Sequence, residues 1–217
     1  MSTSKFCVVI ASNEKYRVMP QEVDHPVIRL DYADEMTFEL VPAFEDKTGQ
    51  HQHADSQPNC YIIGASPTEW RLADYDYDAL VISTLNSVAE KRLVPSIKMV
   101  KAYFRAAKLP LESFHTEILV ASIVPNTVAD WEGKHDYGYP HILASFLSQA
   151  ATVATRPVIL PGSFSPPTNS NLPQEYLAKL GIHFAFRAEA AWQICADTNV
   201  NSAIARWRAF FGDPFPT

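Results

Sequence analysis

Residues 95–119 read PSIKMVKAYFRAAKLPLESFHTEIL, and this stretch predicts two helices joined by a short turn. Two stripes recur at helical spacing in its first half, one apolar (Ile97, Val100, Phe104) and one basic (Lys98, Lys101, Arg105, Lys108). Pro110 ends the first helix because proline lacks the backbone N–H that a continuing helix needs. Ser113 is a favourable N-cap residue for the second helix. The residues expected to face inward in that helix are Phe114, Ile118 and Leu119.

Helical periodicity continues on both sides of this stretch. The ranges that carry it are 79–91, 139–155, 174–196 and 200–211, and Gly212 follows the last of them as a stop. The segment from Pro157 to Pro173 is rich in proline and has no helical pattern, so we expect a long extended connection there. From about residue 79 onward the chain is therefore predicted to be helical.

Residues 27–41 predict an antiparallel β-hairpin. Residues 27–32 (VIRLDY) and 36–41 (MTFELV) alternate between apolar and polar side chains, and residues 33–35 (ADE) supply a turn between them. Successive side chains of a strand point to opposite faces. In the second strand, Met36, Phe38 and Leu40 share one face, and Thr37, Glu39 and Val41 share the other. Pro42 ends this strand, since proline cannot donate to a continuing ladder.

The composition is that of a globular protein, because 47% of the 217 residues are hydrophobic and 19% are charged, and this excludes intrinsic disorder. The 18 basic and 24 acidic residues give a net charge of −6. This charge argues against sequence-independent binding of nucleic acid over the whole surface, but leaves room for a local basic groove.

No stretch approaches the roughly 18 unbroken apolar residues of a membrane span. Cys7, Cys60 and Cys195 form no C-x-x-C pair, so we predict no zinc site or disulfide framework and expect a reducing cytoplasm.

Three local patterns resemble known sites but lack residues that those sites need. Residues 74–78 (DYDYD) begin like a calcium loop without its later glycine and glutamate, so a solvated turn before a helix is predicted instead. His51 and His53 lie in a polar loop without a clear third metal ligand. Residues 162–169 (GSFSPPTN) resemble the phosphate loop of adenylyltransferases that activate nicotinamide mononucleotide, but Asn171 stands about where that loop needs a histidine.

Four segments, in order along the chain, carry a resemblance to one protein family: residues 38–44 (FELVPAF), 61–64 (YIIG) with Trp70, 96–103 (SIKMVKAY) with 111–119 (LESFHTEIL), and 203–216 (AIARWRAFFGDPFP). They resemble the cyclic GMP–AMP synthase/DncV-like nucleotidyltransferases (CD-NTases). These are the bacterial cyclic-oligonucleotide synthases of antiphage (CBASS) defence, and they are relatives of oligoadenylate synthase. The order and spacing of the four segments over nearly the whole chain carry the resemblance.

The resemblance implies an α+β fold. A partial nucleotidyltransferase (polymerase-β-like) palm with a β-hairpin, residues 1–78, would be carried on a C-terminal helical lobe, residues 79–217. The family resemblance also implies Mg²⁺ or Mn²⁺, nucleotide substrates of the ATP or GTP type, a role in antiviral defence, and partner proteins from a defence operon. Neither a membrane nor a nucleic acid is an expected partner.

The resemblance further implies a set of site residues. Glu39 stands at the position of the family's third carboxylate, which binds a catalytic metal ion. Lys98 and Lys101 stand three apart on one helical face, where their ammonium groups can neutralise a triphosphate. Ser113 can offer its hydroxyl and nearby backbone N–H groups to phosphate oxygens, and Phe114 can stack on a base.

Each of these residues also has a purely structural interpretation. Glu39 can be a solvent-facing residue of a half-exposed strand, and Lys98 and Lys101 can be part of a solvated basic face. Ser113 can be a plain N-cap. An aromatic residue such as Phe114 is more often part of a core than a base-stacking platform.

The sequence departs from the family in its N-terminal part. In the family, a Gly-Ser turn cradles the donor phosphates, and an Asp-x-Asp pair on the preceding strand binds both metal ions. Nothing before Val27 matches either motif, and the third carboxylate is usually aspartate rather than the longer Glu39. We therefore expect a truncated or degenerate relative that does not catalyse transfer alone. The alternatives are a non-catalytic nucleotide-binding or protein-interaction module that kept the fold, and a purely structural helical protein.

Overall fold

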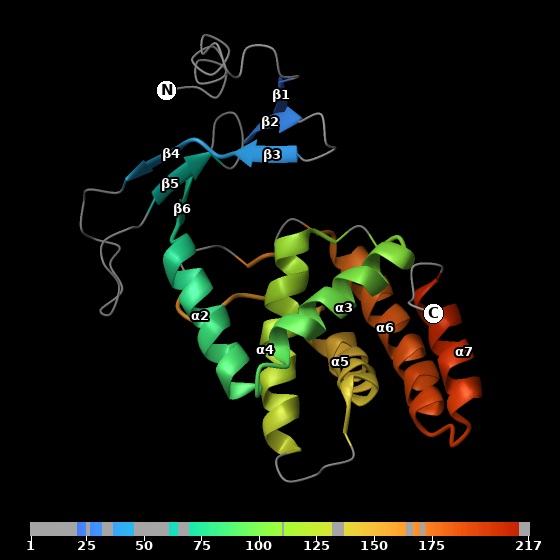
Figure 1. Cartoon of the computed structure of the whole chain (residues 1–217). Coiled ribbons are helices and arrows are strands. Elements are labelled where there is room, and N and C mark those ends of the chain that lie inside the picture. Colours follow the sequence, from blue (N-terminus) through green and yellow to red (C-terminus); the bar gives the residue numbers. More distant parts are fainter. Residues whose placement is uncertain are drawn as a thin grey trace. The chain divides into compact units, whose positions relative to one another are not determined.

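The structure is a computed structural model of the 217-residue chain. It describes residues 21–24, 27–31, 37–45, 61–64, 70–109, 111–131, 137–163, 167–169 and 172–212. The chain divides into two compact units, one of residues 1–78 with 163–165 and the other of residues 79–162 with 166–217. The described part of the first unit consists mainly of strands, with the start of a helix at residues 75–78, and helices dominate the second (Figure 1), which confirms the predicted α+β class.

The described strands of the first unit form two three-stranded antiparallel sheets. The bounds of the strands are β1 Gln21–Asp24, β2 Val27–Asp31, β3 Thr37–Leu40, β4 Ala43–Glu45, β5 Tyr61–Gly64 and β6 Trp70–Ala73. In the first sheet β2 lies between β1 and β3, with Leu30 opposite Phe38 and Asp31 opposite Thr37. The predicted hairpin over 27–41 is thus confirmed as β2 and β3, and its turn lies outside the described residues.

The helices follow the second half of the chain (Figure 1). Their bounds are α2 Tyr75–Val88, α3 Leu93–Ala106, α4 Ser113–Asp130, α5 Tyr139–Val153, α6 Gln174–Cys195 and α7 Val200–Phe211. The predicted helices over 139–155, 174–196 and 200–211 match α5, α6 and α7 within two residues at each end. As predicted, Gly212 follows α7, with a positive φ of 80°. No helix among the described residues is long and apolar enough to cross a membrane.

The start of α2 corrects one prediction. Residues 74–78 are not a solvated turn, because Asp74 is buried and α2 begins at Tyr75 rather than at Ala79. The Asp74 carboxylate accepts a hydrogen bond from the Tyr77 backbone N–H at 2.9 Å. An aspartate immediately before a helix satisfies a backbone donor of the first turn in this way and favours a helix start at that point.

The core of the second unit is aromatic and aliphatic. Phe104 of α3 meets Phe146 of α5 and Phe184 of α6, and the Phe104 and Phe184 rings stack with centroids 5.5 Å apart. The buried Tyr103 of α3 stacks on Phe210 of α7. Helix α4 packs against both α3 and α5, and most of its side chains are buried. Pro125 lies in the interior of α4, so the Ala121 carbonyl has no N–H to accept from at the usual helical position.

Helices α5 and α6 form the most extensive helix pair, and their close approach depends on Gly181. A Cβ atom at position 181 would lie 2.7 Å from the Ala151 carbonyl oxygen and 3.2 Å from Thr155 Cγ2. The first of these distances is shorter than van der Waals contact allows. The two helix backbones can therefore meet here only because residue 181 has no side chain.

The described residues of the connection between α5 and α6 contain no helix, as predicted, and the buried Asn169 organises them. The Asn169 Oδ1 accepts from the Val158 backbone N–H at 3.1 Å. Its Nδ2 donates to the carbonyl oxygens of Ala154, at 3.2 Å, and Arg156, at 2.5 Å. One amide side chain thus joins the end of α5 to a segment more than ten residues further along.

Candidate functional site

Glu39 lies on β3, in the first unit, with its side chain exposed. Its partner across the β2–β3 ladder is Arg29. Among the described residues, no group of three or more histidine, cysteine, aspartate or glutamate side chains lies together so as to hold a metal ion. We therefore assign no chemical step to a metal.

The other four predicted site residues lie in the second unit. Lys98 and Lys101 are both on α3, but their surroundings differ. Lys98 is exposed and forms no ion pair with another described residue. The half-buried Lys101 ammonium forms an ion pair with the Glu117 carboxylate of α4. The positive charge of Lys101 is therefore already matched by a carboxylate, whereas that of Lys98 is not.

The start of α4 corrects two predictions. The N-cap is Glu112, in extended conformation and without a side-chain capping bond, so Ser113 is the first helical residue rather than the N-cap. Phe114 does not face inward, because its side chain is 39% exposed. The inward side of this first turn is instead occupied by His115 and Thr116, which are buried.

The Lys101–Glu117 ion pair joins α3 to α4, and we call these two residues together with Lys98, Ser113 and Phe114 the α3–α4 surface. Ser113 and Glu117 are one helical turn apart, so Ser113 lies on the side of α4 that meets Lys101. The backbone N–H groups of this first turn have no acceptor within the helix. The exposed ring of Phe114 lies beside them. The surface thus combines cations, free backbone donors and an aromatic face.

Two histidines, the buried His115 and the half-buried His183, were not among the predicted site residues. His115 lies just after Phe114, and its Nε2 has no hydrogen-bond partner among the described residues. Burial lowers the pKa of His115. His183 of α6 hydrogen-bonds through Nε2 to the Tyr103 hydroxyl at 2.7 Å. Burial, followed by the nearby Arg187 charge, lowers the pKa of His183, and burial raises the pKa of Tyr103 to about 12.

These shifts predict a loss of stability at mildly acidic pH. In the folded state the pKa values of His115 and His183 lie below the usual 6.5. As the pH falls through that value, the unfolded state therefore binds more protons than the folded state. The free energy of unfolding should be nearly constant between about pH 7 and pH 8 and should decrease between pH 7 and pH 5. Urea unfolding followed by circular dichroism measures it. The lowered carboxylate pKa values of Asp31 and Asp197 act only at lower pH, below about 4.

The substitution His115→Leu should reduce this pH dependence, because it removes one of the two groups. Equal free energies of unfolding at pH 7 and pH 5 for the unsubstituted chain would contradict the assignment of both histidines as neutral in the folded state.

No family model matches the sequence, and no curated protein matches it. Solved structures do match. The CdnC protein of E. coli MS115-1 with ATP matches with a TM-score of 0.68 and 12% identity, over 91% of this chain and 66% of that one. The same protein in the CdnC:HORMA-deltaN complex matches with a TM-score of 0.68 and 12% identity, over 99% of this chain and 70% of that one.

A third similar structure is the Vibrio cholerae di-nucleotide cyclase DncV in complex with GTP and 5MTHFGLU2. It matches with a TM-score of 0.63 and 13% identity, over 99% of this chain and 58% of that one. This chain therefore has the fold of CdnC and DncV over nearly its whole length, and the predicted nucleotidyltransferase-like fold is confirmed. It spans between 58% and 70% of the length of those chains.

Proposed function

Starting from this shared fold, we propose that the chain is a nucleotidyltransferase-family protein of the cyclic-oligonucleotide synthase type and binds nucleoside triphosphates on the α3–α4 surface. The observation that carries the proposal is the match to structures that hold ATP or GTP, together with the α3–α4 surface itself. We assign residues 1–78 to a remnant of the nucleotidyltransferase palm and residues 79–217 to its helical lobe. An antiviral role in the cytoplasm, with Mg²⁺ or Mn²⁺, belongs to the same proposal.

The chemistry of the α3–α4 surface suits a triphosphate. Lys98 is a free cation, and Lys101 becomes a second one when a phosphate replaces Glu117 as its partner. The Ser113 hydroxyl and the backbone N–H groups around it are donors at a helix N-terminus, where anions bind favourably. Phe114 exposes a ring on which a base can stack, a contact worth about 1–3 kcal/mol in other nucleotide-binding proteins.

A second candidate is a non-catalytic nucleotide-binding or protein-interaction module that kept the fold. Two observations favour it. The described residues contain no group of side chains able to hold a metal ion. One of the similar structures, CdnC, is in complex with HORMA-deltaN, so a chain of this fold can carry a protein partner.

Titration of Mg·ATP and Mg·GTP by calorimetry tests the proposal. The chain should bind with a dissociation constant in the millimolar range, about −4 kcal/mol. Lys101→Ala should remove a charge-assisted contact of about 1.5–3 kcal/mol and make binding undetectable. Glu117→Gln should tighten binding about three- to tenfold, because it frees the Lys101 ammonium from its partner.

Lys179→Ala is the matched control, since Lys179 is an exposed lysine of α6 that also pairs with a glutamate, Glu175. It should leave nucleotide affinity unchanged. If Lys101→Ala and Lys179→Ala both bind like the unsubstituted chain, the α3–α4 surface is not the site. If the folded chain binds neither nucleotide, the interaction module replaces the nucleotide-binding proposal.

A further inference from the structure

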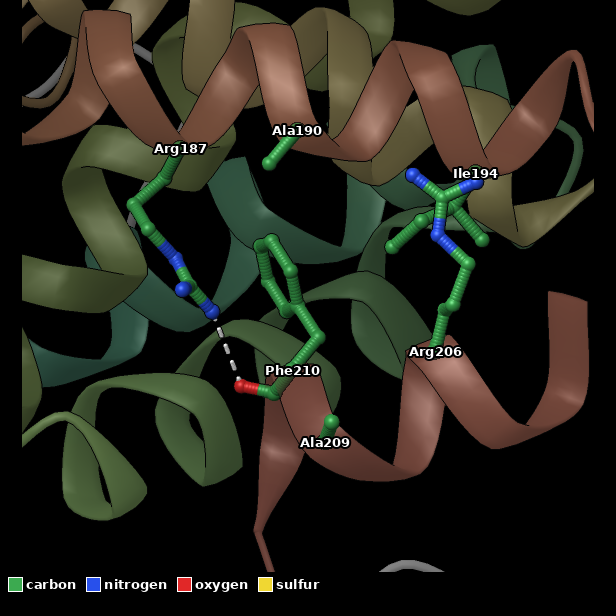
Figure 2. A pocket seen from close by; sticks show the side chains of 6 residues that line it. All are labelled: Arg187, Ala190, Ile194, Arg206, Ala209 and Phe210. Atoms are coloured by element: carbon green, nitrogen blue, oxygen red, sulfur yellow. Dashed lines mark hydrogen bonds between the residues drawn. The ribbon is translucent and has the colours of Figure 1, made fainter.

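A pocket lies between α6 and α7, away from the residues of the α3–α4 surface. Its volume is about 240 Å³, and Figure 2 shows the side chains that line it. They are Arg187, Ala190 and Ile194 of α6 with Arg206, Ala209 and Phe210 of α7. Two guanidinium groups therefore border a pocket whose other walls are alkyl groups and an aromatic ring.

Arg187 brings a positive charge that no carboxylate of the described residues balances. Its guanidinium carbon lies 3.8 Å from the centroid of the Phe210 ring, and its Nη2 donates to the Phe210 carbonyl oxygen at 3.0 Å. Its Nε is buried and has no hydrogen-bond partner in the described part of the chain. A cation taken out of water without a counter-charge raises the free energy of the folded state. A bound anion would lower it.

Arg206 brings a second cation to the pocket. Its Nη1 donates to the Gln193 carbonyl oxygen at 3.3 Å and lies 3.5 Å from the Asp197 carboxylate. Hydrogen bonds from Ser202 and from the Asn199 backbone, and then Arg206, hold the pKa of Asp197 below its usual value. Among the described residues, Asp197 pairs with Arg206 and no carboxylate pairs with Arg187, so the two arginines keep an excess of positive charge. In Figure 2 the Phe210 ring lies between them.

We propose that this pocket binds a small carboxylate with a single aromatic ring. The alkyl groups and the Phe210 ring provide apolar contact for a ring, which an inorganic anion would not use. A planar guanidinium matches the geometry of a carboxylate. The volume lies below the roughly 300–1,000 Å³ of sites for drug-sized molecules, so the proposed ligand has a single ring. This proposal is independent of nucleotide binding on the α3–α4 surface.

Methyl NMR of the full chain, with benzoate as the probe, tests the proposal. The Ile194 methyl signals should shift and saturate at millimolar benzoate, whereas those of Ile182, an exposed residue of the same helix, should not. Benzamide has the ring without the charge, and inorganic phosphate has the charge without the ring. Each should bind at least about fivefold more weakly than benzoate, since each lacks one of the two contacts.

Two variants and one control complete the test. Arg206→Gln should weaken benzoate binding at least about fivefold. Ala209→Leu should abolish it by filling the pocket, and it keeps both arginines. Arg208→Gln removes an exposed arginine of α7 that does not line the pocket and should have no effect. An Ile194 signal that does not move in the folded protein overturns the proposal. So does an Arg208→Gln variant that binds as weakly as Arg206→Gln, or benzamide that binds as tightly as benzoate.

Discussion

Replacement of Asn169 by alanine is expected to lower the free energy of unfolding by about 3–5 kcal/mol. The side chain is buried and makes three hydrogen bonds to backbone groups of the connection after α5. Without it, the Val158 N–H and the carbonyl oxygen of Ala154 lose their partner at a buried site, and the carbonyl oxygen of Arg156 loses its partner at a part-buried one. Each unsatisfied buried group costs about 1–3 kcal/mol. Urea unfolding at pH 7 measures the change.

Asn169→Asp should be at least as destabilising as Asn169→Ala, because a carboxylate would face two carbonyl oxygens that need donors. Thr168→Val is the matched control on the neighbouring residue. The Thr168 hydroxyl donates to the Val158 carbonyl oxygen, which also accepts from the Thr168 N–H at 2.8 Å. Its loss leaves no group unpaired and should cost less than about 1 kcal/mol. Equal effects of the Thr168 and Asn169 variants would contradict the role given to Asn169.

Gly181→Ala is expected to destabilise the fold by about 1–3 kcal/mol, although alanine is the better helix former. The new Cβ would lie 2.7 Å from the Ala151 carbonyl oxygen, a backbone atom that cannot rotate away. Helices α5 and α6 must therefore separate, and the buried Phe184 and Phe146 would lose contact across the gap. Thermal unfolding by calorimetry measures the change.

The control for Gly181→Ala is the opposite substitution at an exposed position of the same helix, Ala178→Gly. It reports the helix propensity difference alone and should destabilise by about 1 kcal/mol. If helix propensity alone decided the outcome, Gly181→Ala would therefore stabilise α6. A Gly181→Ala variant more stable than the unsubstituted chain would show that α5 and α6 do not depend on this close approach.

The helices could be predicted from the sequence where a long apolar stripe repeats. Helices α6 and α7 match the ranges read from their periodicity closely, because burial of one face decides both the pattern and the structure. Strand β1 was not predicted. Its sequence, QEVD, has no alternating apolar pattern, and its place in the sheet comes from pairing with β2.

The sequence could not predict that Lys101 pairs with a carboxylate and Lys98 does not, although both lysines were predicted site residues. Spacing along α3 places the two lysines on one face, but only the packing of α4 brings Glu117 to one of them. The burial of the Phe114 and Asp74 side chains could not be predicted either. An aromatic residue in the first turn of a helix can be exposed or buried, and so can an aspartate just before a helix. The aspartate at position 74 did indicate that a helix begins there, because aspartate is a preferred N-cap residue.

Helix α4 has a consequence for how the second unit reaches its folded state. Its sequence is rich in β-branched residues and contains Pro125, so it is a poor helix former. A peptide of residues 113–130 would be a coil in water, and the helix exists because α3 and α5 enclose it. Fragments of the chain that contain α4 without α3 and α5 would therefore leave α4 unfolded. The stability of α4 thus depends on its neighbours, which ties α3, α4 and α5 into one cooperative unit.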